Sequence, residues 1–217
     1  MIVAIAGGHG KIAQLLERQL AEQGHEPIGL VRNADHLADL ERNGARGEVV
    51  DLEHAATEDV AAAIRGADAV VFAAGAGPGS SADRKDSMDR DGAIKLADAA
   101  EQAGIRRYVM VSAIGADDAD PDSDDVFQVY LRAKADADRD VRGRVGLDWT
   151  VVRPGALTDD DGTGLVELTE EAERGSVARA DVASVLAALL TTGAGVGRQV
   201  NLVGGKVPVA EAVAALG

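Results

Sequence analysis

Residues 2–13 read IVAIAGGHGKIA, five apolar residues that run straight into a glycine-rich turn. The apolar run predicts a buried strand, and the apolar positions after the turn recur at helical spacing up to a stop signal at Gly24. The turn fits Gly7-x-x-Gly10-x-x-Ala13 and equally Gly8-x-Gly10-x-x-Ala13, the spacing of a dinucleotide-binding fingerprint. Such a turn lets a pyrophosphate approach the unpaired N–H groups at the start of the helix. Without a ligand, the same residues would form only a tight strand-to-helix connection.

The residue that follows the second predicted strand indicates which dinucleotide is bound. That strand, residues 28–31, ends in Arg32, at a position where an acid would accept the ribose hydroxyls of NAD. A guanidinium suits the additional phosphate of NADP, so we expect NADP (NADPH) rather than NAD, unless Arg32 is a surface residue paired with Asp35. Asp51, at the tip of the third strand, either accepts a hydrogen bond from the adenine or closes the turn before His54.

Short apolar runs alternate with helical periods along the whole chain, and no low-complexity linker divides it. This alternation predicts one α/β domain over residues 1–217, a Rossmann fold whose doubly wound parallel sheet has six or seven strands and helices on both faces. Right-handed crossovers favour the strand order 3-2-1-4-5-6-7. The predicted strands are residues 1–6, 28–31, 48–50, 69–74, 107–112, 148–153 and 199–203.

The composition argues against several kinds of partner. With 22 Lys+Arg against 37 Asp+Glu, the formal charge is −15, which disfavours both nucleic acid and an anionic membrane. The chain has no cysteine, and its acids lack the spacing of metal ligands, so we expect no disulfide, no cysteine nucleophile and no metal site. The first apolar run is too short for a signal peptide, and no run reaches the length of a membrane span. We therefore expect a soluble cytoplasmic protein, monomeric or homodimeric, that acts on a small-molecule substrate.

A second group of candidate residues lies in the middle of the chain. Tyr130 and Lys134 are four residues apart on a predicted helix, and hence on one face of it. An ammonium group beside a phenol lowers the phenol pKa toward the working pH, which suits a general acid/base. The pair follows the fifth strand, whose carboxyl end carries Ser112, and that edge of an open α/β sheet faces the ligand crevice. Alternatively, Tyr130 is an interfacial aromatic residue beside a solvated lysine, and Ser112 caps a turn.

Together these features resemble the short-chain dehydrogenase/reductase superfamily, in particular its compact atypical branch related to epimerases/dehydratases and NmrA-like proteins. The matching motifs span essentially the full length and are Ala6-Gly7-Gly8-His9-Gly10, Asp51-Leu52, Ala73-Ala74-Gly75, Met88-Asp89-Arg90-Asp91-Gly92, Val111-Ser112-Ala113-Ile114-Gly115, Tyr130 to Lys134, Arg153-Pro154-Gly155 and Arg179-Ala180-Asp181-Val182-Ala183. The resemblance implies that Tyr130 donates and accepts the proton, that Lys134 lowers its pKa and binds the nicotinamide ribose, and that Ser112 polarises the substrate oxygen. The usual asparagine of this family is replaced by Asp89, which either holds the water of the proton relay or pairs with Lys134 and weakens its effect.

The glycine turn and the resemblance also imply which residues contact the cofactor. His9 and Lys11 would add positive charge near the phosphates or point into solvent. Residues 154–178 would cover the substrate, and Asp181 would cap the helix that follows. The numerous acids near the predicted crevice would form a solvated rim rather than select against anionic substrates. The expected cofactor contacts are Gly7, Gly8, His9, Gly10, Lys11, Ile12, Arg32, Asp51, Leu52, Ala73, Ala74, Gly75 and Lys134, with Pro154 and Gly155 beneath the nicotinamide.

We therefore expect an NADPH-dependent oxidoreductase that transfers hydride to or from a small carbonyl or alcohol compound, with Tyr130 as the acid/base. Sugar epimerisation is an alternative, although little sequence remains for a separate domain that would bind a nucleotide sugar. Flavin or quinone reduction by hydride transfer alone would tolerate the loss of Tyr130. A non-catalytic NADP(H)-binding redox sensor is the third alternative, because the atypical branch often keeps the cofactor site without the catalytic set.

Overall fold

The computed structural model describes residues 1–77 and 79–217, and Pro78, in the predicted loop over residues 75–83, lies outside them. Within the described residues, nine strands form one sheet in the order β11-β8-β10-β6-β5-β4-β1-β2-β3. All neighbouring strands from β10 to β3 are parallel, so the predicted order is confirmed with β10 as the seventh strand. The strands are β1 (Ile2–Ala6), β2 (Glu26–Val31), β3 (Arg46–Val49), β4 (Ala69–Phe72), β5 (Arg107–Val111), β6 (Asp148–Pro154), β8 (Leu165–Thr169), β10 (Arg198–Gly204) and β11 (Val207–Pro208).

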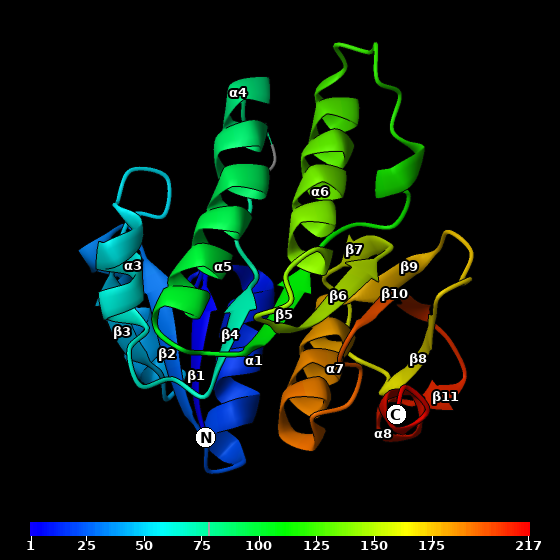
Figure 1. Cartoon of the computed structure of the whole chain (residues 1–217). Helices are drawn as coiled ribbons and strands as arrows, with labels where there is room; N and C mark the ends of the chain where they lie inside the picture. The colour runs from blue at the N-terminus through cyan, green and yellow to red at the C-terminus, as the bar shows by residue number, and fades with distance from the viewer. Residues whose placement is uncertain (78) are drawn as a thin grey trace.

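Helices cover both faces of the sheet (Figure 1). Successive side chains of a strand point to opposite faces, and in β1 both sets are fully buried from Val3 to Ala6. Val3 and Ile5 pack with α1 and α7, whereas Ala4 and Ala6 pack with α3, α5 and α6. A strand that is apolar on both faces is typical of a parallel sheet between two helical layers. The helices are α1 (Lys11–Glu22), α2 (Leu37–Arg42), α3 (Thr57–Ala63), α4 (Ala82–Arg84), α5 (Asp91–Gln102), α6 (Val126–Arg142), α7 (Arg179–Thr192) and α8 (Val209–Ala214).

The helical region between β4 and β5 is interrupted by a π-helical segment. This segment, η2 (Lys85–Arg90), joins α4 to α5 and carries Lys85, Met88 and Asp89 as buried residues. A π turn holds one more residue than an α turn, which re-aims the side chains around it, and such turns are frequent at functional sites. The interruption therefore points two ionisable side chains, Lys85 and Asp89, into the interior at one end of the sheet.

The chain between β6 and α7 contains strands that the sequence analysis missed. Residues 165–169 form β8, which runs antiparallel to β10 and, with β11, extends the sheet beyond the parallel strands. Residues 156–158 form β7 and pair with β9 (Ser176–Ala178) in a separate two-stranded sheet. In β8 the buried residues alternate with exposed ones, so its inner face completes the core and its outer face meets solvent.

Asp181 does not cap α7, which corrects the prediction. The helix begins at Arg179 after the N-cap residue Ala178, and Asp181 lies inside its first turn, almost fully buried. Its carboxylate accepts hydrogen bonds from the backbone N–H groups of Thr163, at 3.0 Å, and Gly164, at 2.8 Å. Asp181 therefore fixes the loop that enters β8 rather than the end of its own helix.

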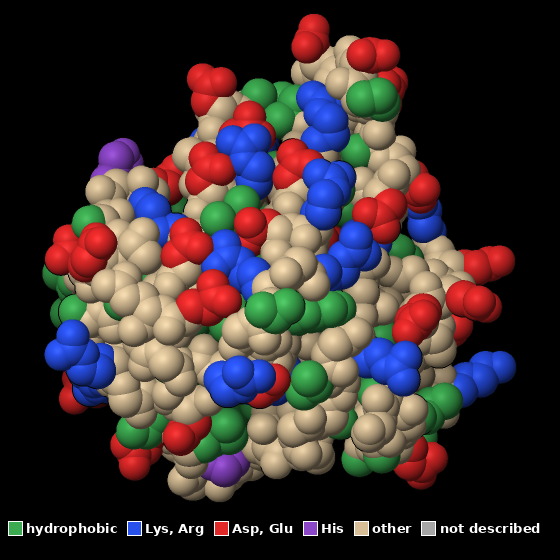
Figure 2. All heavy atoms as spheres, viewed as in Figure 1, with side chains coloured by type: hydrophobic (Ala, Val, Ile, Leu, Met, Phe, Trp, Pro, Cys, Tyr) green, Lys and Arg blue, Asp and Glu red, His purple; other side chains and the backbone are tan. Residues whose placement is uncertain are grey.

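Charged side chains are spread over the outer surface. On the face shown in Figure 2, acidic and basic groups are interspersed, and acidic groups project at the upper tip. The aspartates of the loop ahead of α6, at positions 117, 118, 120, 122, 124 and 125, are exposed, as expected for a solvated rim. In the part of the chain that is described, none of the helices combines the length and apolarity that a membrane crossing demands.

Candidate active site

The glycine turn between β1 and α1 is shaped by close backbone packing. Gly7 has a φ of +81°, and a Cβ there would lie 2.7 Å from the Cα of Ala74. A Cβ on Gly8 would lie 2.8 Å from the Cα of Gly29. Gly10 is the N-cap of α1, and no described side chain caps that helix. The turn therefore leaves the first N–H groups of α1 available to an anion such as a pyrophosphate.

Two adjoining cavities lie at the carboxyl ends of the parallel strands. The smaller, of about 280 Å³, extends from the glycine turn to the ends of β2 and β3. The larger, of about 710 Å³, lies between the end of β5, η2 and the start of α6. Both are lined by Ala73, Ala74 and Gly75, so they form one groove with two chambers that meet beside the glycine turn. This shape fits a dinucleotide whose pyrophosphate lies at the turn.

Most of the predicted cofactor contacts line this groove. In the larger chamber are Ile12 and Lys134. Among the described residues, Gly8, Lys11, Pro154 and Gly155 are not part of either lining, so their contact with the cofactor stays a prediction. The smaller chamber is lined by Gly7, His9, Gly10, Arg32, Asp51 and Leu52, together with the three shared residues Ala73, Ala74 and Gly75.

Lys11 is held at the mouth of the groove instead. Its ammonium forms an ion pair with Asp159, and Nη1 of Arg179 donates to the same carboxylate at 2.7 Å. Lys11 begins α1, Asp159 follows β7, and Arg179 begins α7. This three-residue contact, here called the Asp159 bridge, ties the glycine turn to the segment that we expected to cover the substrate.

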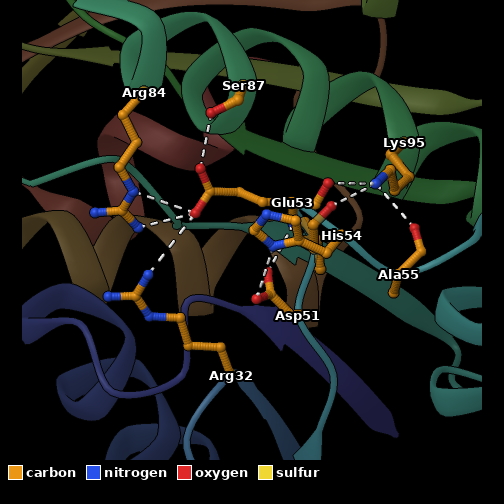
Figure 3. Close-up of polar contacts among 9 residues, drawn as sticks. Arg32, Asp51, Glu53, His54, Ala55, Arg84, Ser87 and Lys95 are labelled. Carbon is orange, nitrogen blue, oxygen red and sulfur yellow. Dashed lines mark hydrogen bonds and ion pairs between the residues drawn. The ribbon is translucent and has the colours of Figure 1, made fainter. Parts of the chain in front are cut away.

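The outer end of the smaller chamber carries several ionisable groups (Figure 3). Arg32 lies 3.8 Å from Glu53 and is not paired with Asp35, whose backbone N–H instead donates to the side chain of Asn33. Asp51 accepts hydrogen bonds from the Glu53 backbone, at 3.0 Å, and from His54. Asp51 therefore closes the turn while also lining the chamber, so both roles considered for it are compatible with its position.

Two histidines stack beside the glycine turn. The rings of His9 and His36 are parallel, with centroids 3.7 Å apart, and Nε2 of His9 lies 2.7 Å from a carboxylate oxygen of Asp39. Both rings line the smaller chamber. The imidazole of His9 is therefore oriented by Asp39, rather than left free in solvent.

The four predicted catalytic residues meet in the larger chamber. Tyr130, Lys134, Ser112 and Asp89 all line it. Lys134 and Asp89 are almost fully buried and form an ion pair of 3.3 Å, and Lys134 also donates to the carbonyl of Val111 at 3.1 Å. Of the two roles considered for Asp89, pairing with Lys134 is the one that the geometry shows.

The surroundings of Tyr130 raise the pKa of its phenol. Its ring lies 5.8 Å from Nζ of Lys134 and 5.2 Å from Nζ of Lys85. Burial raises the pKa of Tyr130; Lys134 lowers it, as expected, but Asp89 and Asp138 raise it further, and the net shift is upward. This arrangement suits a proton donor better than a base.

A series of hydrogen bonds between polar side chains extends from Ser112 away from the larger chamber. Its Oγ donates to Asp138 at 2.8 Å, and Nε of Arg153 donates to the same carboxylate oxygen, also at 2.8 Å. Arg153 in turn binds Asp117 through both of its Nη atoms. Because its hydrogen points to Asp138, Ser112 presents lone pairs to the chamber in this state, and it would have to rotate to donate to a substrate oxygen.

Sequence reasoning missed two residues that line this groove, Arg84 and Lys85, and one that is buried behind Ser112, Asp138. Asp138 continues the spacing of Tyr130 and Lys134 by another four residues, a signal that was available in the sequence. Lys85 and Arg84 are aimed at the groove by the α4–η2 junction, which no sequence pattern predicted.

Comparison with known proteins supports the binding of a nicotinamide dinucleotide, without choosing between NAD(H) and NADP(H). Residues 7–193 match a family described as NAD(P)H-binding. The chain belongs to this NAD(P)H-binding family. It is 36% identical to a Bacillus subtilis protein named as an uncharacterised sugar epimerase, over 98% of this chain and 99% of that one.

Solved structures give the same result for the NAD(P)H-binding chain. A candidate NAD-dependent epimerase/dehydratase from Bacillus halodurans is 37% identical, with a TM-score of 0.91 and full coverage of both chains. ChuY from Escherichia coli O157:H7, described as an anaerobilin reductase, is 27% identical with a TM-score of 0.78, covering 94% of this chain and 97% of that one. The NAD(P)H-binding protein thus lies in the atypical, short-chain dehydrogenase/reductase-like branch, among epimerase-like and oxidoreductase relatives.

Proposed function

We propose that this NAD(P)H-binding protein is an NADPH-dependent reductase that transfers hydride to a small carbonyl compound while Tyr130 protonates the carbonyl oxygen. The supporting observation is the place of the Tyr130 side chain in the wall of the larger chamber, with its ring centroid 5.8 Å from Nζ of Lys134. The surroundings raise the pKa of the phenol, which favours the acid form. Reduction of a carbonyl requires a proton donor, whereas alcohol oxidation requires the phenolate. The cofactor would supply the hydride when bound.

The other side chains of the larger chamber would prepare this transfer. Lys134 and Asp89 form a buried ion pair, so the ammonium can hold a ribose hydroxyl without adding net charge beside the substrate. Asp138 fixes the Ser112 hydroxyl against the end of β5. Arg32, at the far end of the groove, supports NADPH over NADH because its guanidinium faces the chamber where an adenine ribose would lie.

A second candidate substrate class is a planar conjugated molecule, such as a flavin, a quinone or a tetrapyrrole. Phe127 is 59% exposed at the mouth of the larger chamber, 6.0 Å from the Tyr130 ring. The chain has only two phenylalanines, and the other one, Phe72, is fully buried. A flat ring would stack on the exposed Phe127 and on Tyr130 beside it. A structurally similar protein is described as an anaerobilin reductase, which favours the same class. Hydride transfer to such a ring does not require Tyr130 as an acid.

Oxidation of NADPH by the purified protein, measured with panels of carbonyls, flavins and quinones, tests both candidates. Tyr130→Phe should lower kcat for carbonyl reduction about 10²- to 10⁴-fold, the usual contribution of a general acid. Tyr108→Phe is the matched control, because Tyr108 is fully buried and donates to Ala93, outside the groove. Turnover that survives Tyr130→Phe on a conjugated acceptor supports the second class. Isomerisation without net loss of NADPH would point to an epimerase, and tight binding without turnover on any panel to a non-catalytic protein.

A further inference from the structure

Two arginines from opposite walls of the smaller chamber converge on one buried carboxylate (Figure 3). Arg32 comes from the end of β2, and Arg84 comes from α4. Nε and Nη2 of Arg84 donate to Oε2 of Glu53 at 3.2 and 3.0 Å, and Nη1 of Arg32 lies 3.8 Å from the same oxygen. Both arginines line the chamber, whereas the Glu53 side chain, only 8% exposed, lies behind them.

Glu53 is itself held in place from several directions. Oγ of Ser87 donates to its second carboxylate oxygen at 2.7 Å. Nζ of Lys95 donates to the backbone carbonyls of Leu52, Glu53 and Ala55, which fixes the loop that carries Glu53. Burial opposes its charge, yet the hydrogen bonds from Arg84 and Ser87 hold the pKa of Glu53 below its ordinary value. Glu53 is thus a fixed anion against which a guanidinium can be oriented.

The guanidinium of Arg84 keeps donors free for a ligand. Arginine has five N–H donors. Three of them are used by Glu53 and by the carbonyl of Ala76, which accepts from Nη1 at 3.1 Å. Within the described residues this leaves one N–H on each Nη atom, in a plane fixed by three hydrogen bonds. The Arg32 side chain is 57% exposed, and its contact with Glu53, at 3.8 Å, is longer than a hydrogen bond. Arg32 can therefore move toward a ligand.

We propose that Arg84 and Arg32 form a two-guanidinium subsite for the phosphate on the adenine ribose of NADPH, with Arg84 as its fixed half and Glu53 as the residue that positions it. This inference rests on the proposed function, which places NADPH in the groove. A phosphate bound by two guanidiniums receives several charge-assisted hydrogen bonds, which neither the Arg32 side chain alone nor the acidic surface of the protein would provide. Arg84 then determines the choice between NADPH and NADH as much as Arg32 does.

Calorimetric titration of the purified full-length chain with NADPH, NADH, 2′,5′-ADP and 5′-AMP tests the subsite without relying on turnover. Arg84→Met should raise the Kd of the two ligands that carry the 2′-phosphate about 10- to 100-fold, the effect of losing charge-assisted bonds. The Kd of NADH and of 5′-AMP should stay within about twofold, which also shows that the variant is folded. Arg84→Lys should recover only a small part of the loss, because a lysine cannot be held at two points by Glu53.

Two further variants complete the test. Arg46→Met is the matched control, because Arg46 is an exposed arginine paired with Glu48 on β3, outside the groove, and it should change no Kd. Glu53→Gln should weaken NADPH binding and leave NADH binding unchanged, since it loosens the orientation of Arg84. Tighter NADPH binding by Glu53→Gln would overturn the positioning role, because it would mean that Glu53 only neutralises the arginines.

The outcomes separate this inference from the proposed function. If the wild-type protein binds neither NADPH nor NADH, the proposed function fails. If it prefers NADPH and Arg84→Met keeps that preference, the subsite is wrong and the proposed function stands. If it binds both dinucleotides equally, both the subsite and the preference for NADPH are wrong. Hydride transfer from either cofactor is then tested by the turnover assay alone.

Discussion

Asp89 stands where the resemblance to short-chain dehydrogenases/reductases leads us to expect an asparagine. It pairs with Lys134, and its charge is one of the groups that raise the pKa of Tyr130. Asp89→Asn should therefore lower the pKa of Tyr130, because it removes a negative charge from beside the phenol and leaves the Lys134 ammonium unopposed. Reduction should then lose its proton donor at a lower pH than in the wild type.

The measurement is the absorbance of tyrosinate during a pH titration. The chain has two tyrosines, so a Tyr108→Phe background leaves Tyr130 as the sole reporter. In that background Tyr130 should titrate above its ordinary value of 10.0, and Asp89→Asn should move the transition downward. An unchanged transition would show that Asp89 does not act on the phenol.

Glu17 makes folding stability depend on pH. It is fully buried beneath the glycine turn, one of its carboxylate oxygens has no partner among the described residues, and burial raises its pKa to about 8. Because the folded state holds the proton more tightly than the unfolded state, this residue costs nothing below the unfolded pKa near 4.5 and costs progressively more up to about pH 8. The cost above pH 8 is on the order of 5 kcal/mol.

Denaturation in urea at several pH values measures this effect. Glu17→Gln should become more stable than the wild type as the pH rises from 5 to 9. Glu22→Gln, an exposed residue of the same helix, is the control and should follow the wild type. A constant difference between Glu17→Gln and the wild type across this range would contradict the buried, neutral state of Glu17.

At the scale of an element, Lys95 holds the β3–α3 loop to α5. Its ammonium donates to three carbonyls of that loop, at 2.7, 3.1 and 2.9 Å. Lys95→Met should lower the free energy of unfolding by about 1–3 kcal/mol, because carbonyls that were hydrogen-bonded lose a charged donor. Hydrogen exchange should also speed up in residues 52–55, whereas Lys206→Met, at an exposed site, should change neither. Unchanged exchange in the loop would show that other contacts hold it.

Some strands could be predicted from the sequence and others could not. The difference depends on whether a strand is marked by its own residues or only by pairing with residues far away in the sequence. Most of the parallel strands carry their own signal, because an uninterrupted apolar run such as AVVF in β4 must be buried on both faces. The edge strands β7, β9 and β11 have only two or three residues each, and their pairing depends on distant partners. In β8 the alternation of LVELT was present in the sequence, but the surrounding acids and glycines masked it.

The groove residues divide in the same way. Glycine spacing located the turn, and the four-residue spacing of Tyr130 and Lys134 placed both in the larger chamber. The ion pair of Lys134 with Asp89 was one of two alternatives, since its choice depends on how η2 packs against α6. Arg84 and Glu53 had no local signal, because their contact joins a helix to a loop 31 residues away in the sequence.

At the scale of the whole molecule, the groove is built from both halves of the sheet. The smaller chamber depends on β1, β2 and β3, and the larger one on β5 and α6, so a dinucleotide would contact both. NADPH at 100 times its Kd should add about 2.7 kcal/mol to stability and raise Tm by about 5–10 °C for a chain of this size. Thermal unfolding with increasing NADPH measures the shift. A Tm that stays constant at saturating NADPH would show that the cofactor does not bind the folded chain.

The Asp159 bridge has a kinetic consequence. It lies at the mouth of the groove, but the side chains of Lys11 and Asp159 are 66% and 60% exposed. An ion pair so open to water contributes little stabilisation free energy. The side chains of the Asp159 bridge should separate and re-form on a much shorter timescale than the dissociation of a tightly bound nucleotide. The contacts inside the two chambers should therefore set the dissociation rate of a bound nucleotide, and opening of the Asp159 bridge should not limit it.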